Sequence, residues 1–220
     1  TTQQIGALNT LQASKLNTSE IAAMSNSQVA ALSTANVAAM GTANILQLNS
    51  SQFKALTSTQ MAALTTSQVR SFGLTSQLSW LSTAQLGAIA TASIKAMDTA
   101  QLQALTTAQF KGLNTDQVSA MTTLQVSKLT TAQLASGFST GMIAALSSSQ
   151  AAVLTSDQVA SLTGVQLAAV ETDDLQAITS SLVGLKSNQI ASLTTAQMVA
   201  LTSAQIGAMT TTQLAGLTSA

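Results

Sequence analysis

The sequence contains no cysteine, histidine, proline or tyrosine among its 220 residues. Without cysteine there are no disulfide bonds and no thiol chemistry, and the redox compartment of the protein stays open. Without histidine the commonest metal ligand is missing as well. These absences already remove several kinds of chemistry before any motif is considered.

Charge is also scarce, because Asp, Glu, Lys and Arg make up 6% of the chain and cancel to a net charge of zero. No basic surface exists to neutralise phosphates, so we expect no nucleic-acid partner. Hydrophobic residues reach 46%, but Thr or Ser interrupts them and no apolar run is long enough to span a membrane. Residues 1–4 lack the features of a secretory signal, so an exported form needs a signal that lies elsewhere or has been removed.

What the sequence does contain is an eight-residue repeat from end to end. A large apolar residue occupies its first core position, with Ala13 as a weak member and with phase slips near 71–73, 137–142 and 182–186. The members are Ile5, Ile21, Val29, Val37, Ile45, Phe53, Met61 and Val69, then Leu78, Leu86, Ile94, Leu102, Phe110, Val118, Val126 and Leu134, then Ile143, Val159, Leu167, Leu175 and Val183, and after a one-residue deletion Ile190, Met198, Ile206 and Leu214. We therefore expect a single repeat array over 1–220.

A second core position follows three residues after the first, as in Leu8, Leu16 and Met24. Residues three apart share one face of a helix but lie on opposite faces of a strand, so the spacing predicts helix. The abundant Ala, Gln, Leu and Met favour helix as well. The Thr and Ser content is the main argument for the alternative, a β-solenoid.

The residue after the second core position, here called the cap position, is nearly always a helix N-cap type. Its members include Asn9, Asn17, Ser25, Ser33, Asn49, Thr57, Thr65, Thr75, Ser82, Asp98, Thr106, Asn114, Thr122 and Thr130. Three residues later comes the amide position, with Gln or Glu at Gln12, Glu20, Gln28, Gln52, Gln60, Gln68, Gln85, Gln101 and Gln109. This spacing is a capping box, so each octad reads as its own short helix of two turns. The acids support this interpretation, because all of them fall at or just after a cap, where the helix dipole favours negative charge.

A lone octad is not expected to fold. Two large side chains supply roughly 3 to 6 kcal/mol of burial, against about 8 kcal/mol or more for ordering eight residues of backbone. Neighbouring turns must complete the burial, and small alanines such as Ala7 and Ala23 allow adjacent turns to approach closely. We therefore predict an all-α solenoid, a superhelix with one capped helix per octad.

No residues converge into a catalytic, cofactor or metal site. The adjacent acids Asp173 and Asp174 fall where helix N-terminus residues belong, so dipole stabilisation explains them better than metal binding. Met24, Met40, Met97, Met121 and Met209 occupy the second core position and are interpreted as core fillers. Trp80 replaces a small residue and marks either a bulge, a contact between chains or a partly buried filler. We expect no enzyme, no cofactor and no small-molecule substrate.

The octads that contain Leu105-Thr106-Thr107-Ala108-Gln109 and Leu193-Thr194-Thr195-Ala196-Gln197 resemble the repeats of very large bacterial exoproteins. Such proteins are often labelled, loosely, as haem-utilisation or adhesion proteins. The resemblance covers essentially the whole chain and implies a secreted or surface location. It carries no haem ligand, because His and Tyr are absent.

Two structural functions follow as expectations, the stalk of a surface adhesin and the subunit of a filament or sheath. The expected partners are further copies of the chain or other domains of the same giant protein. The array starts at a cap residue, Thr1, and stops inside an octad at Ala220, so we expect a piece of a longer array. Regular Thr and Ser side chains leave an ice- or glycan-binding module as the alternative.

The capping box can be tested at Thr106 and Gln109. Replacing both residues by Ala should lower the free energy of unfolding by about 1 to 2 kcal/mol, because one box is lost. Urea unfolding followed by circular dichroism measures the change. Unchanged stability would count against the model of capped helices.

Overall fold

The computed structural model describes residues 1–178 and 181–217, and within these ranges the secondary structure is helical, with no strand. The predicted all-α fold is confirmed, and the β-solenoid alternative is wrong. The helices are four to seven residues long, so most are shorter than the two turns expected. In the described part of the chain, no helix combines the length and apolar character that a membrane crossing requires.

The chain divides into two compact units, Thr1–Leu105 and Thr106–Ala220. The first unit contains α1 (Thr2–Gly6), α2 (Thr10–Lys15), α3 (Thr18–Ala22), α4 (Asn26–Ala31), α5 (Thr34–Ala39), α6 (Thr42–Gln47), α7 (Ser50–Lys54), α8 (Ser58–Ala63), α9 (Thr66–Arg70), α10 (Gln77–Trp80), α11 (Thr83–Ala88), α12 (Thr91–Ala96) and α13 (Thr99–Ala104). The second contains α14 (Thr107–Phe110), α15 (Thr115–Ala120), α16 (Thr123–Ser127), η1 (Gln133–Gly137), α17 (Thr140–Ala144), α18 (Ser148–Ala151), α19 (Ser156–Ser161), α20 (Gly164–Ala168), α21 (Thr172–Ala177), η2 (Ser181–Gly184), α22 (Ser187–Ile190), α23 (Thr195–Ala200), α24 (Ser203–Gly207) and α25 (Thr211–Leu217).

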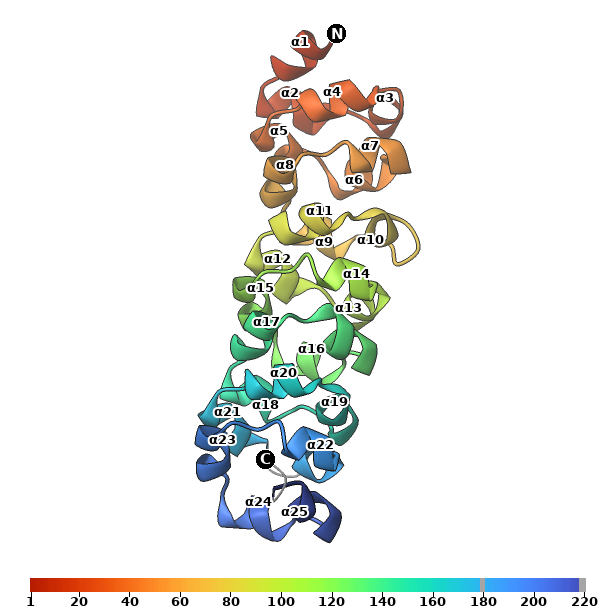
Figure 1. The fold of residues 1–220 in the computed structure, drawn as a ribbon. Helices are drawn as coiled ribbons and strands as arrows, with labels where there is room; N and C mark the ends of the chain where they lie inside the picture. The colour runs from red at the N-terminus through yellow and green to blue at the C-terminus, as the bar shows by residue number, and fades with distance from the viewer. Residues whose placement is uncertain (179–180, 218–220) are drawn as a thin grey trace. The chain divides into compact units, whose positions relative to one another are not determined.

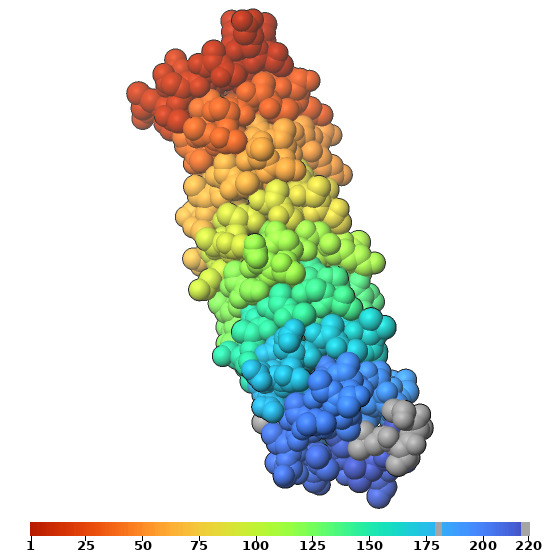
Figure 2. All heavy atoms as spheres, turned by 60° about the vertical axis from the view of Figure 1, so that its left-hand side comes forward, coloured from red at the N-terminus to blue at the C-terminus, as the bar shows by residue number. Residues whose placement is uncertain are grey.

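Within each unit the helices form stacked layers, and a helix packs on the third one along the chain. In the first unit α1 contacts α4, α2 contacts α5 and α5 contacts α8 (Figure 1). In the second unit α14 contacts η1, α18 contacts α21 and α22 contacts α25. In the space-filling view each unit accordingly shows bands of colour in sequence order (Figure 2). Successive octads therefore coil around a common interior, as a solenoid requires.

The core of each unit consists of the two predicted core positions. First-position residues such as Ile21, Phe53 and Phe110 are completely buried. Second-position residues such as Leu48 and Leu105 are 2% exposed. Most octads therefore place both of their large side chains inside the stack, which is the burial that a single octad cannot achieve alone. The prediction is wrong at Ile206 and Leu214, which are 45% and 38% exposed because no later turn among the described residues packs on them.

The predicted capping boxes are confirmed at most octads. In α8 the Thr57 hydroxyl accepts a hydrogen bond from the backbone N–H of Gln60 at 3.2 Å. The side-chain Oε1 of Gln60 accepts in turn from the backbone N–H of Thr57 at 2.8 Å. The boxes at Asn9, Asn17, Ser25, Asn49, Thr65, Ser82, Asp98, Thr106, Asn114 and Thr122 follow the same pattern. Ser33 caps its helix without the reciprocal bond. Most helices therefore start where the side chain of the cap residue satisfies a first backbone donor, while α6 and α12 start without such a bond.

The first insertion is accommodated in the loop before α10. The predicted cap at Thr75 is wrong, because α10 begins after Ser76 and no side chain caps it. The Gly73 amide instead donates to Gln77 Oε1 at 3.2 Å, four residues on where other octads have three. The extra residue thus lengthens the loop before α10, where the bond to the Gly73 backbone N–H is the part of the capping box that is kept, and Leu78 returns to the first core position, completely buried.

The second insertion is absorbed inside a helix. Leu134 and Phe138 are both buried core residues, and they lie four apart instead of three. The backbone between them forms the π-helix η1, whose wider turn takes up one extra residue. The Phe138 ring stacks on Phe110 with centroids 5.8 Å apart. The insertion therefore leaves the order of core residues intact.

At the deletion the sequence placed the wrong residue in the core. Val183 is 49% exposed, while Leu182 is 3% exposed and fills the first core position. Ile178 and Leu182 lie four residues apart, where other octads have five between successive core residues. Both valine and leucine suit a buried position, so only the stacking of turns distinguishes them.

Gly137 offers a test of the packing around η1. A methyl group there would lie 2.7 Å from Phe110 Cβ, which is too close without a shift of one of the two segments. Gly137→Ala should therefore lower the free energy of unfolding by about 1 to 3 kcal/mol. Gly141→Ala is the matched control, because its methyl meets nothing closer than 3.9 Å. Equal stability of the two variants in urea unfolding would contradict the packing described.

Candidate functional site

The residue at the amide position makes contacts in two directions. Gln60 is 2% exposed, and its side-chain Oε1 accepts from the cap residue of its own helix. Its Nε2 donates to the carbonyl oxygens of Val29 at 2.9 Å and Leu32 at 2.7 Å. Those two residues lie in and just after α4, one superhelical turn earlier. The amide therefore closes a capping box and bridges two turns at once.

The same bridge recurs through both units. Its Nε2 reaches the carbonyl of a residue at the second core position over 2.6 to 3.0 Å, as in Gln52, Gln60, Gln68, Gln85 and Gln101 of the first unit and Gln150, Gln158, Gln166, Gln189, Gln197, Gln205 and Gln213 of the second. The sequence separation is 28 residues in uninterrupted register, 29 across an insertion and 27 across the deletion. The bridge therefore spans three octads plus the four residues that separate the second core position from the next amide position.

The bridge solves a problem that short helices create. A helix of four to seven residues leaves most of its last carbonyl groups without a partner inside the helix. Buried and unpaired, each such carbonyl would cost about 1 to 3 kcal/mol. A primary amide carries one acceptor oxygen and two donor hydrogens. The oxygen can accept from the backbone N–H of the cap residue, and the two hydrogens can be donated to two carbonyls of the previous turn. Glutamine is therefore selected by both contacts together.

Asparagine and methionine at the amide position keep only one of the two contacts. Asn36 donates to Leu8 O at 2.8 Å and Asn44 to Leu16 O at 2.6 Å, but neither side chain completes a capping box. Met142 does the reverse, because its sulfur accepts from the Ser139 amide at 3.3 Å and has no hydrogen to donate. The bridge and the box are thus separable functions of one side chain.

Acids at the amide position follow the same logic. Glu20 completes a capping box with Asn17 in the first turn, where its side chain is exposed and makes no bridge. Asp174 is 5% exposed and accepts from the Ser148 hydroxyl at 2.7 Å. A carboxylate has no hydrogen to donate to a carbonyl of the previous turn, so a buried acid at the amide position cannot form the bridge.

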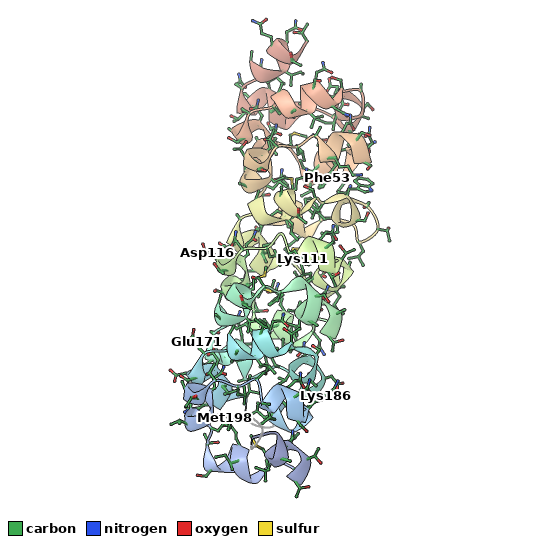
Figure 3. The ribbon with its side chains drawn as sticks, in the orientation of Figure 1. Phe53, Lys111, Asp116, Glu171, Lys186 and Met198 are labelled. Carbon is green, nitrogen blue, oxygen red and sulfur yellow. The ribbon has the colours of Figure 1, made fainter. Side chains whose placement is uncertain are left out.

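The acids flagged in the sequence do not gather into a metal site. Within the described ranges, no group of three or more Asp or Glu side chains has the arrangement to hold a metal ion. Asp116 and Glu171 lie on one side of the second unit and Lys186 on the other (Figure 3). Glu171 occupies the cap of α21 without making a side-chain cap bond. The acids are therefore dispersed features of single helices.

The large side chains singled out in the sequence pack in the interior. Met24, Met40, Met97 and Met121 are 3 to 8% exposed, as core fillers should be, while Met209 is partly exposed. Trp80 is partly buried and lies edge-on to Phe53, with ring centroids 6.0 Å apart. The Trp80 ring thus extends the Phe53 cluster beside the first insertion.

These features define a helical repeat protein, built from octads that are held together by side-chain amides. Six segments of the sequence match the model of the ALTTAQ repeat, at residues 14–42, 29–66, 94–131, 126–164, 167–203 and 182–219. The matches cover more than half of the sequence, and the chain belongs to the ALTTAQ repeat family. No curated protein matches it.

The bridge can be tested by exchanging Gln for Glu at two places. Gln60→Glu keeps the capping box but removes both donors to the previous turn, and it should lower the free energy of unfolding by about 2 to 4 kcal/mol. Gln12→Glu is the matched control, because Gln12 is exposed, closes a box with Asn9 and makes no bridge. Its stability should stay within about 0.5 kcal/mol.

Both variants are to be compared in urea unfolding at neutral pH. If Gln60→Glu and Gln12→Glu lose the same stability, the amide acts only as a cap and the bridge contributes nothing measurable.

Proposed function

We propose that this array is a structural spacer, the stalk of a bacterial surface protein outside the cell. The bridging amide is the observation that supports the proposal best. Every bridge connects a turn to the turn before it, so stability accumulates with each added octad and needs no contact with distant parts of the sequence. Such a construction extends to any length, which is what a spacer requires.

The chemistry of the surface supports the same function. The sequence has only seven basic and seven acidic residues for 9739 Å² of accessible surface, and the cap and following positions present mainly Thr, Ser and Asn. Hydroxyl and amide groups keep such a surface hydrated without attracting charged macromolecules. The resemblance to repeats of large exoproteins supports the extracellular location.

A filament or sheath subunit is the second candidate, and one observation favours it. The apolar side chains that the second unit exposes most are Leu124 at 60%, Val165 at 71% and Val199 at 83%. Because the surface carries so little charge, only weak electrostatic repulsion opposes lateral contact between copies of the chain, and such contact can form. Such contacts would make the surface, and not the length, the functional part.

Electron microscopy and sedimentation velocity over a wide range of concentrations distinguish the two candidates. For a spacer we expect dispersed particles and a sedimentation coefficient that does not rise with concentration. Long uniform fibres would overturn the spacer proposal in favour of the filament.

Leu124→Lys with Val165→Lys provides the control variant, because both side chains project into solvent and their replacement leaves the core unchanged. If fibres form through the apolar side chains, the double variant should abolish them. If the native protein stays dispersed, the variant should sediment in the same way.

A further inference from the structure

The π-helix η1 lies beside the one buried amide position that methionine occupies. Within the described residues η1 is the only π-helix, and π-turns inside helices are frequent at functional sites. Met142 follows η1 at the amide position of α17. Two exceptions to the repeat therefore coincide in one place in the second unit.

A cavity of about 210 Å³ opens at this place. The end of α14, the end of η1 and the start of α17 form its walls. The residues that matter here are Lys111, Leu113, Ser136, Phe138 and Met142. At about 30 Å³ for each water molecule, the volume corresponds to roughly seven waters, or to one substituted aromatic ring.

The floor of the cavity is apolar. Leu113 and Phe138 are 5% exposed and Met142 is 2% exposed, so these side chains are held rigidly by the core. Phe138 is further fixed by its stacking on Phe110. A thioether next to an aromatic ring makes a polarisable surface, which suits a flat aromatic ligand.

Leu113, which lines the cavity, carries a carbonyl for which the repeat normally supplies a donor. Gln150 and Gln158 each donate to a carbonyl 29 residues earlier, and in the same register Met142 corresponds to Leu113. The Met142 sulfur has no hydrogen, and no hydrogen bond from the described residues reaches the Leu113 carbonyl. The site thus offers an acceptor where a ligand donor would replace the missing amide.

A positive charge lies at the rim. Lys111 is exposed at the end of α14, and its ammonium makes no ion pair or side-chain hydrogen bond among the described residues. The Ser136 hydroxyl is exposed in the same wall. Together these two groups can bind a carboxylate at the mouth of the cavity.

We propose that this cavity binds a small aromatic carboxylic acid that carries a hydroxyl group on its ring. The carboxylate lies at Lys111, the ring packs on Phe138 and Met142, and the ring hydroxyl donates to the Leu113 carbonyl. The proposal is independent of whether the array serves as a spacer or a filament.

The probe is 4-hydroxybenzoate, titrated into the whole chain with isotope-labelled methionine methyl groups. The Met142 methyl resonance should shift in a saturable manner, while that of Met61 in the first unit stays unchanged. Benzoate, which lacks the donor, and 4-hydroxybenzyl alcohol, which lacks the charge, should each bind about threefold to tenfold more weakly. No saturable shift of Met142 would overturn the proposal.

Met142→Gln gives the decisive variant, because it installs the residue found in the other turns. The new side-chain amide should donate a hydrogen bond to the Leu113 carbonyl and so raise the unfolding midpoint. It should also weaken 4-hydroxybenzoate binding, measured by calorimetry, by at least about tenfold. Lys111→Gln should weaken binding about threefold to fivefold, and Lys186→Gln, on another part of the unit, should leave it unchanged. Binding that persists at full strength in a folded Met142→Gln protein would show that the probe binds elsewhere.

Discussion

The side-chain amide of the glutamine repeated in the octads determines how successive turns of this chain are joined. Because each helix is little more than one turn long, its end carbonyls cannot be satisfied from within, and the glutamine of a later turn supplies the missing hydrogens. The same glutamine starts its own helix by accepting from the cap residue. Core burial provides most of the driving force, but it is non-directional. The amide sets which carbonyl faces which donor, and so sets the size of the turn.

Much of this arrangement could be predicted from the octad alone. The spacing of three between core residues and the boxes between Thr57 and Gln60 or Asn49 and Gln52 are local, so the sequence contains them fully. The bridge joins residues 28 apart, and no short-range pattern reveals that distance. One clue was present: the amide position holds Gln almost throughout, although a capping box and the helix dipole both accept Glu. The octad predicts Val183 in the core and Thr75 as a cap, and both predictions are wrong. Where a loop changes length, the packing of one turn on the next decides which residue is buried, and the octad pattern does not contain that information.

Repetition also limits the variety of functional groups that the array can present. A catalytic site needs unlike groups that converge, whereas each octad presents the same hydroxyls and the same amide in the same place. New properties arise only where one octad differs from its neighbours, as at Met142 or Asp174, and each such exception removes a bridge that the others keep. A regular array tolerates a few losses, since every remaining turn is still held by its own bridge.

The stacking of each helix on the third one along the chain has a consequence for how such arrays change length. Within a unit, adding or losing one octad would rotate the octads that follow by about a third of a turn around the stack, so a surface group that they carry would face a new direction. Three octads complete about one turn and restore the original direction. An array that gains octads singly therefore changes the direction of its surface groups as it lengthens, while one that gains them in threes changes its length alone.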